Sequence, residues 1–249
     1  MSSMSDALRA EWTKLRTVPS TGWLLLAVLT VTVGVSALAA GTACPRSACA
    51  ADPVRTSLTG VGFGQALVAG LAVSMVAGEN AMLRLTFASM PRRVVVLTAK
   101  AVLAGVLVAA AAIVAVGLSL LAGQLLLPAG VAVAGAEPLA RAALGSVAYL
   151  VLIGWLSLGV SAAIRDSAAA VGTVLGLLYV VPIVAAAVSD PDWQRRLQQV
   201  GPMSAGLAVQ ATRNLSQLPI GPWAGMGVLA AWSLAMLLVG GTLLRLHDA

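Results

Sequence analysis

Charged side chains are scarce in this sequence, and their scarcity argues against a soluble globular fold. Only 10% of the 249 residues are charged, whereas soluble domains average about 25%. Hydrophobic residues make up 59% of the chain, so a soluble protein of this composition would expose large apolar patches and aggregate. The composition therefore predicts a polytopic membrane protein.

Histidine and cysteine are nearly absent, which disfavours metal sites and most nucleophilic catalysis. His247, close to the C-terminus, is the single histidine, and Cys44 and Cys49 are the two cysteines. A zinc site needs several histidine, cysteine or carboxylate ligands, and a serine–histidine pair needs a histidine beside the nucleophile. We therefore expect no metal site, no catalytic residue and no cofactor in this chain.

Acidic residues are missing from the centres of the apolar stretches. Aspartyl catalysis, or coupling to a proton or ion gradient, would place acids at membrane depth. The chain also lacks a G-x-x-x-x-G-K-[ST] loop, which is one device for binding ATP. An intramembrane hydrolase is therefore disfavoured, and if the chain drives transport, its energy must come from another molecule. The nine acids lie in predicted loops or at predicted span ends: Asp6, Glu11, Asp52, Glu79, Glu137, Asp166, Asp190, Asp192 and Asp248.

What the sequence does contain is six apolar stretches of sufficient length, since a spanning helix needs about 20 apolar residues. We predict an all-α polytopic membrane protein that forms one transmembrane domain over residues 1–249. The six predicted spans are about 21–41, 57–77, 98–121, 142–164, 168–188 and 223–244.

Basic residues predict the orientation and the surroundings of this domain. Nine of the 15 basic residues fall on the side of the two termini and six on the opposite side, which favours two cytoplasmic termini in the plasma membrane. In a soluble protein the net charge of +6 would suggest a nucleic-acid partner. In a membrane protein, anionic lipid headgroups explain it, so we expect lipid partners and no nucleic acid.

The first 20 residues predict a helix that lies in the membrane interface. Leu8, Trp12 and Leu15 share one helical face, whereas Lys14 and Arg16 lie off it. Such a helix places its tryptophan at headgroup depth and turns its bases toward phosphates. A disordered basic leader is the alternative. The basic start and following apolar run also resemble a secretory signal, but the run is longer than a signal's and five more spans follow, so we expect an uncleaved first span.

Four polar residues outside the cytoplasmic loops are further candidates. Cys44 and Cys49 fall in a predicted outside loop, where a small-loop disulfide can persist; two free thiols are the alternative. Gln65, in the second span, and Gln124, after the third, are candidates for lining a path, and Gln65 can equally be a satisfied packing residue. Before the sixth span, residues 202–209 suit a shallow re-entrant helix packed on protein, or an interfacial loop.

The most charged stretch, residues 78–100, lies between the second and third spans and predicts a short amphipathic helix followed by a basic turn. Leu83, Phe87 and Met90 fall on one helical face, and Pro91 ends the helix. These bases can be simple topology determinants. Alternatively, this helix is a handle by which a soluble partner moves the membrane domain. The charged residues of the stretch are Glu79, Arg84, Arg92, Arg93 and Lys100.

These features together resemble the membrane subunits, or permeases, of type-2 ABC exporters in their small actinobacterial form. The resemblance is spread over most of the chain and depends on the order and spacing of several short motifs. It is carried by Glu11-Trp12-Thr13-Lys14-Leu15-Arg16, Arg84-Leu85-Thr86, Pro91-Arg92-Arg93, Val96-Leu97, Ala99-Lys100, Arg165 and the span after it, Pro202 to Gly206, and Pro222-Trp223-Ala224-Gly225.

The resemblance implies a six-span subunit that pairs as a homodimer or with a paralogous permease. It also implies a separate ATPase subunit that binds ATP and magnesium, an N-terminal connecting helix, and short outer helices before the sixth span. The coupling helix that docks the ATPase would then contain Glu79, Arg84, Phe87, Met90, Arg92 and Arg93. One departure is that only four residues separate Glu79 from Arg84, where the family usually has a longer run with Gly-Thr.

We therefore expect the transmembrane subunit of an ATP-driven exporter, with no ATPase site of its own. The apolar interior suggests an amphipathic or lipid-like cargo. The alternative is a non-transporting integral membrane scaffold, or a sensor of lipids or drugs, which would need no ATPase.

Overall fold

The computed structural model describes residues 13, 19–42, 52–80, 93–127, 135–164 and 166–246, and these contain helices and no strand. Within them, six helical stretches are long and apolar enough to cross a membrane. They cover Ser20–Thr42, Pro53–Val76, Leu97–Leu126, Ala136–Ala163, Ser167–Ala187 and Pro222–Leu243. Each overlaps one predicted span, which confirms for the described residues a helical fold with six stretches long and apolar enough to cross a membrane.

The helices follow one another in an up-and-down order. The spanning helices are α2 (Pro19–Thr42), α3 (Pro53–Ser57) with α4 (Val61–Asn80), α6 (Arg93–Leu126), α7 (Ala136–Ala163), α8 (Ser167–Leu175) with η1 (Gly176–Val180) and α9 (Val181–Ala187), and α12 (Pro222–Leu246). Between α9 and α12 lie the short helices α10 (Pro191–Val200), α11 (Pro202–Gly206), η2 (Leu207–Gln210) and η3 (Leu215–Gln217).

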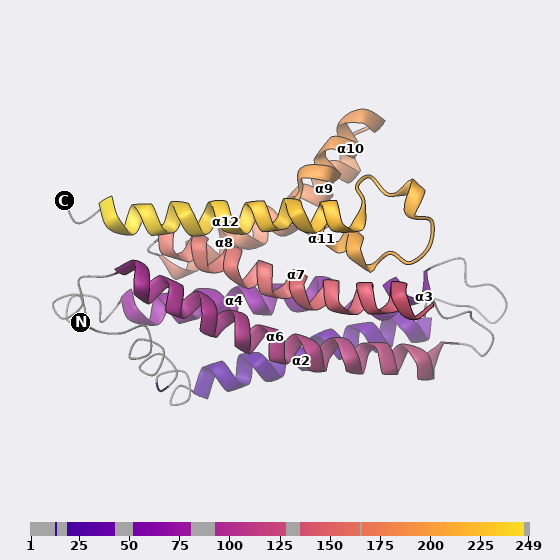
Figure 1. The fold of residues 1–249 in the computed structure, drawn as a ribbon, viewed down its shortest axis with the longest axis horizontal. Helices are drawn as coiled ribbons and strands as arrows, with labels where there is room; N and C mark the ends of the chain where they lie inside the picture. Colours follow the sequence, from indigo (N-terminus) through magenta and orange to yellow (C-terminus); the bar gives the residue numbers. More distant parts are fainter. Residues whose placement is uncertain are drawn as a thin grey trace.

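Figure 1 shows that the spanning helices lie roughly parallel to one long axis. The start of α2 and the end of α12 lie at the same end of the bundle, which we call the proximal end. The opposite, distal end holds α3 and the start of α12, and α10 projects sideways from the bundle near it. We call residues 189–221, which connect α9 to α12, the distal cap.

Helix α7 is the central helix, packed against α4, α6 and α12. Its side chains Tyr149, Leu150, Ile153 and Leu156 are fully buried. By contrast, α2 and α12 each have only 22% of their most apolar window buried within the chain. Apolar faces are therefore left over for lipid or for another protein chain.

Small residues allow the close helix packing that is typical of membrane bundles. A Cβ atom added at Gly159 of α7 would overlap the backbone of Met236 on α12, and one added at Gly64 of α4 would overlap Thr32 on α2. The glycine-rich second span therefore packs closely at Gly64, whereas Gly70 has open space beside it.

Pro182 interrupts the fifth span. Because proline has no N–H, it cannot donate the α-helical hydrogen bond to the carbonyl four residues earlier. The backbone responds with the π-helical turn η1, which ends two residues before Pro182. Turns of this kind occur mostly as single bulges inside α-helices, frequently at functional sites.

Candidate functional site

Most of the predicted site residues lie outside the described part of the chain. This holds for Trp12, Lys14, Arg16, Cys44, Cys49, Arg84, Phe87, Met90 and Arg92. Glu79 lies in the last turn of α4 and Arg93 is the first residue of α6. The backbone of both residues is described, but their side chains are not. The coupling helix and the interfacial helix therefore stay predictions.

Lys100 is the charged residue of this region whose side chain is described. It is 6% exposed, and its Nζ donates to the carbonyl oxygen of Met75 on α4 at 2.8 Å. A buried ammonium group needs such a partner because desolvation of an unpaired charge is costly. Lys100 therefore joins α6 to α4 within the bundle instead of extending the basic turn.

Gln65 is fully buried at a point where four elements meet. Its Nε2 donates to the carbonyl oxygen of Gly62 at 2.9 Å and to the Sδ of Met203 in α11 at 3.2 Å. Its Oε1 accepts a hydrogen bond from the Tyr149 hydroxyl of α7. The Tyr179 hydroxyl of η1 donates to the same Gly62 oxygen at 2.6 Å. This polar cluster ties the core of the bundle to the π-helical turn and to the distal cap.

The two predicted path-lining residues therefore lie in different environments. Gln65 is satisfied inside the chain, and Gln124 is exposed near the distal end of α6. The structure does not bring them together, and their part in a path stays a prediction.

Asp52, directly before the second span, makes a second connection to the distal cap. It precedes α3 and caps it, because its Oδ1 accepts from the backbone N–H groups of Val54 and Arg55 at 3.2 and 3.3 Å. The Thr212 hydroxyl donates to the same oxygen at 2.7 Å. Its Oδ2 accepts from the backbone N–H groups of Thr212 and Arg213, the latter at 2.9 Å. We call this arrangement the Asp52 latch.

The hydrogen bonds of the latch determine the charge state of Asp52. Burial raises the pKa of the carboxyl group, but the bonds from the Thr212 hydroxyl and from the backbone of Thr212, Arg213 and Arg55 lower it. These bonds favour the ionised form, and together they outweigh burial, so the pKa lies below its ordinary value of 3.8. Asp52 is therefore a carboxylate at neutral pH.

Further side chains hold the distal cap against the bundle. Arg141, near the start of α7, donates through Nη2 to the carbonyl oxygen of Ala211 at 2.8 Å. Gln210 donates to the Ser146 hydroxyl on α7 at 3.1 Å. Within the cap, Gln199 donates to the carbonyl oxygen of Pro219 at 2.7 Å. Residues far apart in the sequence thereby form one structured end of the bundle.

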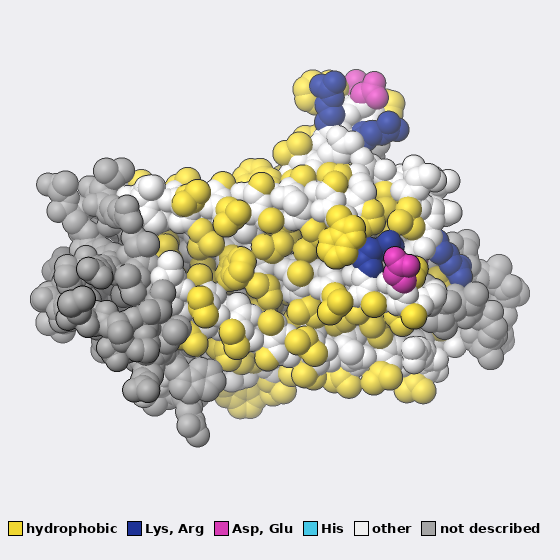
Figure 2. Space-filling model, viewed as in Figure 1, with side chains coloured by type: hydrophobic (Ala, Val, Ile, Leu, Met, Phe, Trp, Pro, Cys, Tyr) yellow, Lys and Arg dark blue, Asp and Glu magenta, His cyan; other side chains and the backbone are white. Residues whose placement is uncertain are grey.

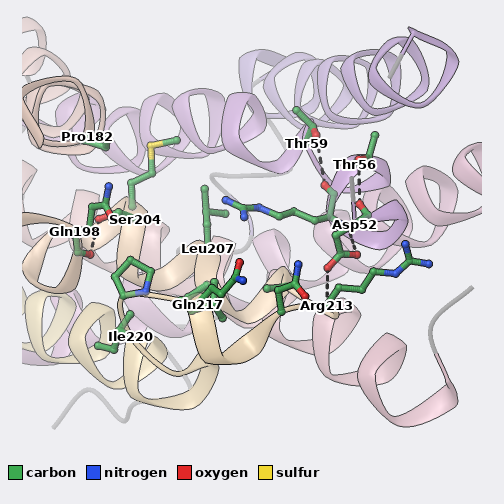
Figure 3. Close-up of a pocket in the computed structure, with 17 residues that line it drawn as sticks. Asp52, Thr56, Thr59, Pro182, Gln198, Ser204, Leu207, Arg213, Gln217 and Ile220 are labelled. Atoms are coloured by element: carbon green, nitrogen blue, oxygen red, sulfur yellow. Dashed lines mark hydrogen bonds between the residues drawn. The ribbon is translucent and has the colours of Figure 1, made fainter. Parts of the chain in front are cut away.

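A cleft of about 790 Å³ lies between the distal cap, α3 and α9. Figure 3 shows the cleft along its length, with Asp52, Thr56 and Arg213 at one end and Pro182 and Ile220 at the other. Its volume falls within the range of small-molecule sites, about 300–1,000 Å³. We call it the distal cleft and regard it as the candidate functional site of the described chain.

The lining of the distal cleft combines charged, polar and apolar side chains. Its lining contains one acid, Asp52, and two bases, Arg55 and Arg213. The side-chain amides of Gln198, Asn214 and Gln217 also line it, as do Met203 and Leu207 from the cap helices. No group of three or more histidine, cysteine or acidic residues that could hold a metal ion occurs among the described residues.

Charged side chains on the described surface in Figure 2 gather at the distal end and on α10, and the long flank of the bundle between the ends is largely apolar. On α10, Arg196 lies over the ring of Trp193, 5.7 Å from its centroid. Such a distribution suits a bundle whose flank lies in hydrocarbon and whose distal end reaches the headgroup region.

Sequence reasoning did not identify Asp52 as a functional residue, although the Asp52-Pro53 pair is a recognisable local signal for the start of a helix. An aspartate directly before a proline is a common helix start, because the carboxylate caps the first turn and proline suits its first position. The same signal occurs at Asp190 before α10. The second set of bonds, from Thr212 and Arg213 to Asp52, could not be read from any local pattern, because these residues lie 160 and 161 positions from Asp52 in the sequence.

Comparison with known proteins does not extend this description. No model of a known protein family matches the chain, and no curated protein matches its sequence. The resemblance to type-2 ABC exporter permeases therefore remains a prediction from short motifs.

Proposed function

We propose that this chain is the transmembrane subunit of an ATP-driven exporter and is driven by a separate cytoplasmic ATPase. The observation that carries the proposal is the position of charge in the six spans. The charged residues within the six apolar stretches are Arg55, Lys100, Glu137 and Arg141, and each falls among the first six residues of its stretch. A transporter coupled to an ion gradient places ionisable groups deeper in the membrane, so another molecule would supply the energy here.

Two further features support the proposal. The apolar faces that α2 and α12 leave uncovered offer room for a second permease subunit. The start of α2, the end of α4, the start of α6 and the end of α12 all lie at the proximal end, so a single partner on that side could reach all four. Rigid spans would transmit its movement to the distal end.

The test is co-purification from the native membrane. The tagged full chain, extracted in mild detergent, should bring down an ATPase subunit in near-stoichiometric amount. Reversing charge in the double variant Arg92→Glu/Arg93→Glu should abolish most ATPase recovery and leave membrane insertion intact, because opposed charges fix the register of such an interface. The matched control is Arg195→Glu/Arg196→Glu on α10, which lies at the distal end and should retain the ATPase.

Two results would overturn the proposal. One is a tagged wild-type chain that never recovers an ATPase. The other is labelling from outside the cell that reaches a cysteine placed at position 92, because no cytoplasmic motor could then act there.

A non-transporting sensor is the second candidate, favoured by the distal cleft. A sensor would bind its ligand in this cleft and pass the signal to a partner without ATP. Recovery of a signalling protein in place of an ATPase, with no effect of the Arg92→Glu/Arg93→Glu variant, would support it.

A further inference from the structure

The distal cleft has two chemically different ends. Charged side chains gather at the end that holds Asp52 and Arg213, whereas Pro182 and Ile220 lie at the other end (Figure 3). Gln198 and Ser204 also lie at that second end, where the Ser204 hydroxyl already donates to the carbonyl oxygen of Gln198 at 2.7 Å. Met203 and Leu207, on the cap helices, are partly buried and extend the apolar wall. The lining is thus amphipathic along its length, and a ligand that fills it needs a polar end and an apolar end.

The charged end of the cleft has an excess of positive charge and of hydrogen-bond donors. Asp52 is its single lining acid, and the carboxylate already accepts five hydrogen bonds. Arg55 is exposed, and only its main chain takes part in the hydrogen bonds of the described residues. Its guanidinium group therefore remains available to an incoming anion, which it can bind through two parallel N–H bonds.

We infer that the distal cleft binds a single-chain amphiphile with an anionic head, which Arg55 holds while the tail lies along Met203, Leu207 and Pro182. A carboxylate, sulfate or phosphate head satisfies the same chemistry. The cleft lies at the distal ends of the spanning helices, where amphiphiles in a bilayer place their heads. The inference depends on the cleft alone and is independent of the transport proposal, because the isolated chain should bind without an ATPase.

The experiment uses the full chain in nanodiscs of phosphatidylcholine, with a dansyl-labelled fatty acid as the fluorescent probe. Dodecanoate and dodecyl phosphate should displace the probe, whereas dodecanol and dodecyltrimethylammonium should do so about tenfold less well, because a charge-assisted hydrogen bond contributes roughly that factor. If only one of the two anions displaces the probe, the preferred head is a carboxylate or a phosphate, and the inference stands.

Variants locate the site. Arg55→Gln should weaken dodecanoate binding about tenfold and leave dodecanol unchanged, and Arg55→Lys should lose less. Arg195→Gln is the matched control, because Arg195 is an exposed arginine on α10 that does not line the cleft. Leu207→Asn should weaken dodecanoate and dodecanol alike, because it interrupts the apolar wall. An unchanged elution volume in size-exclusion chromatography shows that each variant remains folded.

Equal losses in Arg55→Gln and Arg195→Gln would overturn the inference, since the effect would then be general surface charge. Equal displacement by the anionic and neutral amphiphiles would overturn it as well. A diazirine-bearing dodecanoate gives a readout that does not depend on any variant. Its adducts should map to residues 52–59 or 203–220, and adducts confined to the exposed faces of α2 and α12 would refute the site.

Discussion

The Asp52 latch predicts a specific, local loss of stability when its charge is removed. Asn at position 52 keeps the size of the side chain and one acceptor oxygen, so it can still cap α3. Its amide nitrogen cannot accept the bonds that Oδ2 receives from the backbone of Thr212 and Arg213. Hydrogen bonds to charged groups contribute about 1.5–3 kcal/mol each, and partial exposure of the site reduces this, so we expect a loss of about 2 kcal/mol for Asp52→Asn.

Hydrogen–deuterium exchange measures this loss where it occurs. A local opening free energy lowered by about 2 kcal/mol raises the exchange rate of the freed amides about 30-fold. The faster exchange should be confined to residues 211–213 and their neighbours in the distal cap. Amides within α7, which is buried at the centre of the bundle, should exchange as in the wild type.

Asp190→Asn is the matched control for this prediction. Asp190 also precedes a proline and caps a helix, but among the described residues its carboxylate accepts only from the nearby backbone N–H groups of Asp192 and Trp193. Its replacement should leave exchange at residues 211–213 unchanged. If the two variants accelerate exchange there equally, or if Asp52→Asn has no effect, the latch does not hold the cap.

The latch, the packing of α7 on α12 and the Tyr149–Gln65 hydrogen bond each give a further prediction. Because the folded pKa of Asp52 lies below its ordinary value of 3.8, the latch contributes fully above that ordinary value and is lost as pH falls through the folded value. The protection factor of the cap amides, which corrects for the intrinsic exchange rate at each pH, should fall in that acid range in wild type and not in Asp52→Asn. Gly159→Ala should lower the free energy of unfolding by about 1–3 kcal/mol, seen as a lower thermal midpoint in detergent, because the added Cβ would overlap the backbone of α12. Gly172→Ala is the control: Gly172 has open space beside it, so this variant should be neutral or slightly stabilising. Equal midpoints for the two variants would contradict the close packing at Gly159. Tyr149→Phe removes the donor to the buried Oε1 of Gln65 and should cost about 1–3 kcal/mol, measured by the same thermal unfolding; an unchanged midpoint would show that this bond contributes little.

The fold class and the spans could be predicted from the sequence because both depend on local properties. About 20 consecutive apolar residues are needed to cross a bilayer, and the six runs that satisfy this condition coincide with the six spanning helices. The break at Pro182 is also local, since it follows from the missing N–H of one residue. The neighbour that each glycine of the second span meets is not contained in the spacing of these glycines.

The distal cleft and its latch were decided by the tertiary structure. The bonds from Thr212 and Arg213 to Asp52 cross about 160 residues, and Tyr149 meets Gln65 across 84. Sequence periodicity describes one helix at a time, so it shows that Gln65 lies in a span but not that a tyrosine of α7 and a methionine of α11 satisfy it. Hydrophobic burial is non-directional and requires only that these helices lie in the membrane. Directional hydrogen bonds between residues that are distant in the sequence hold the distal cap beside α3, and the cleft lies between them.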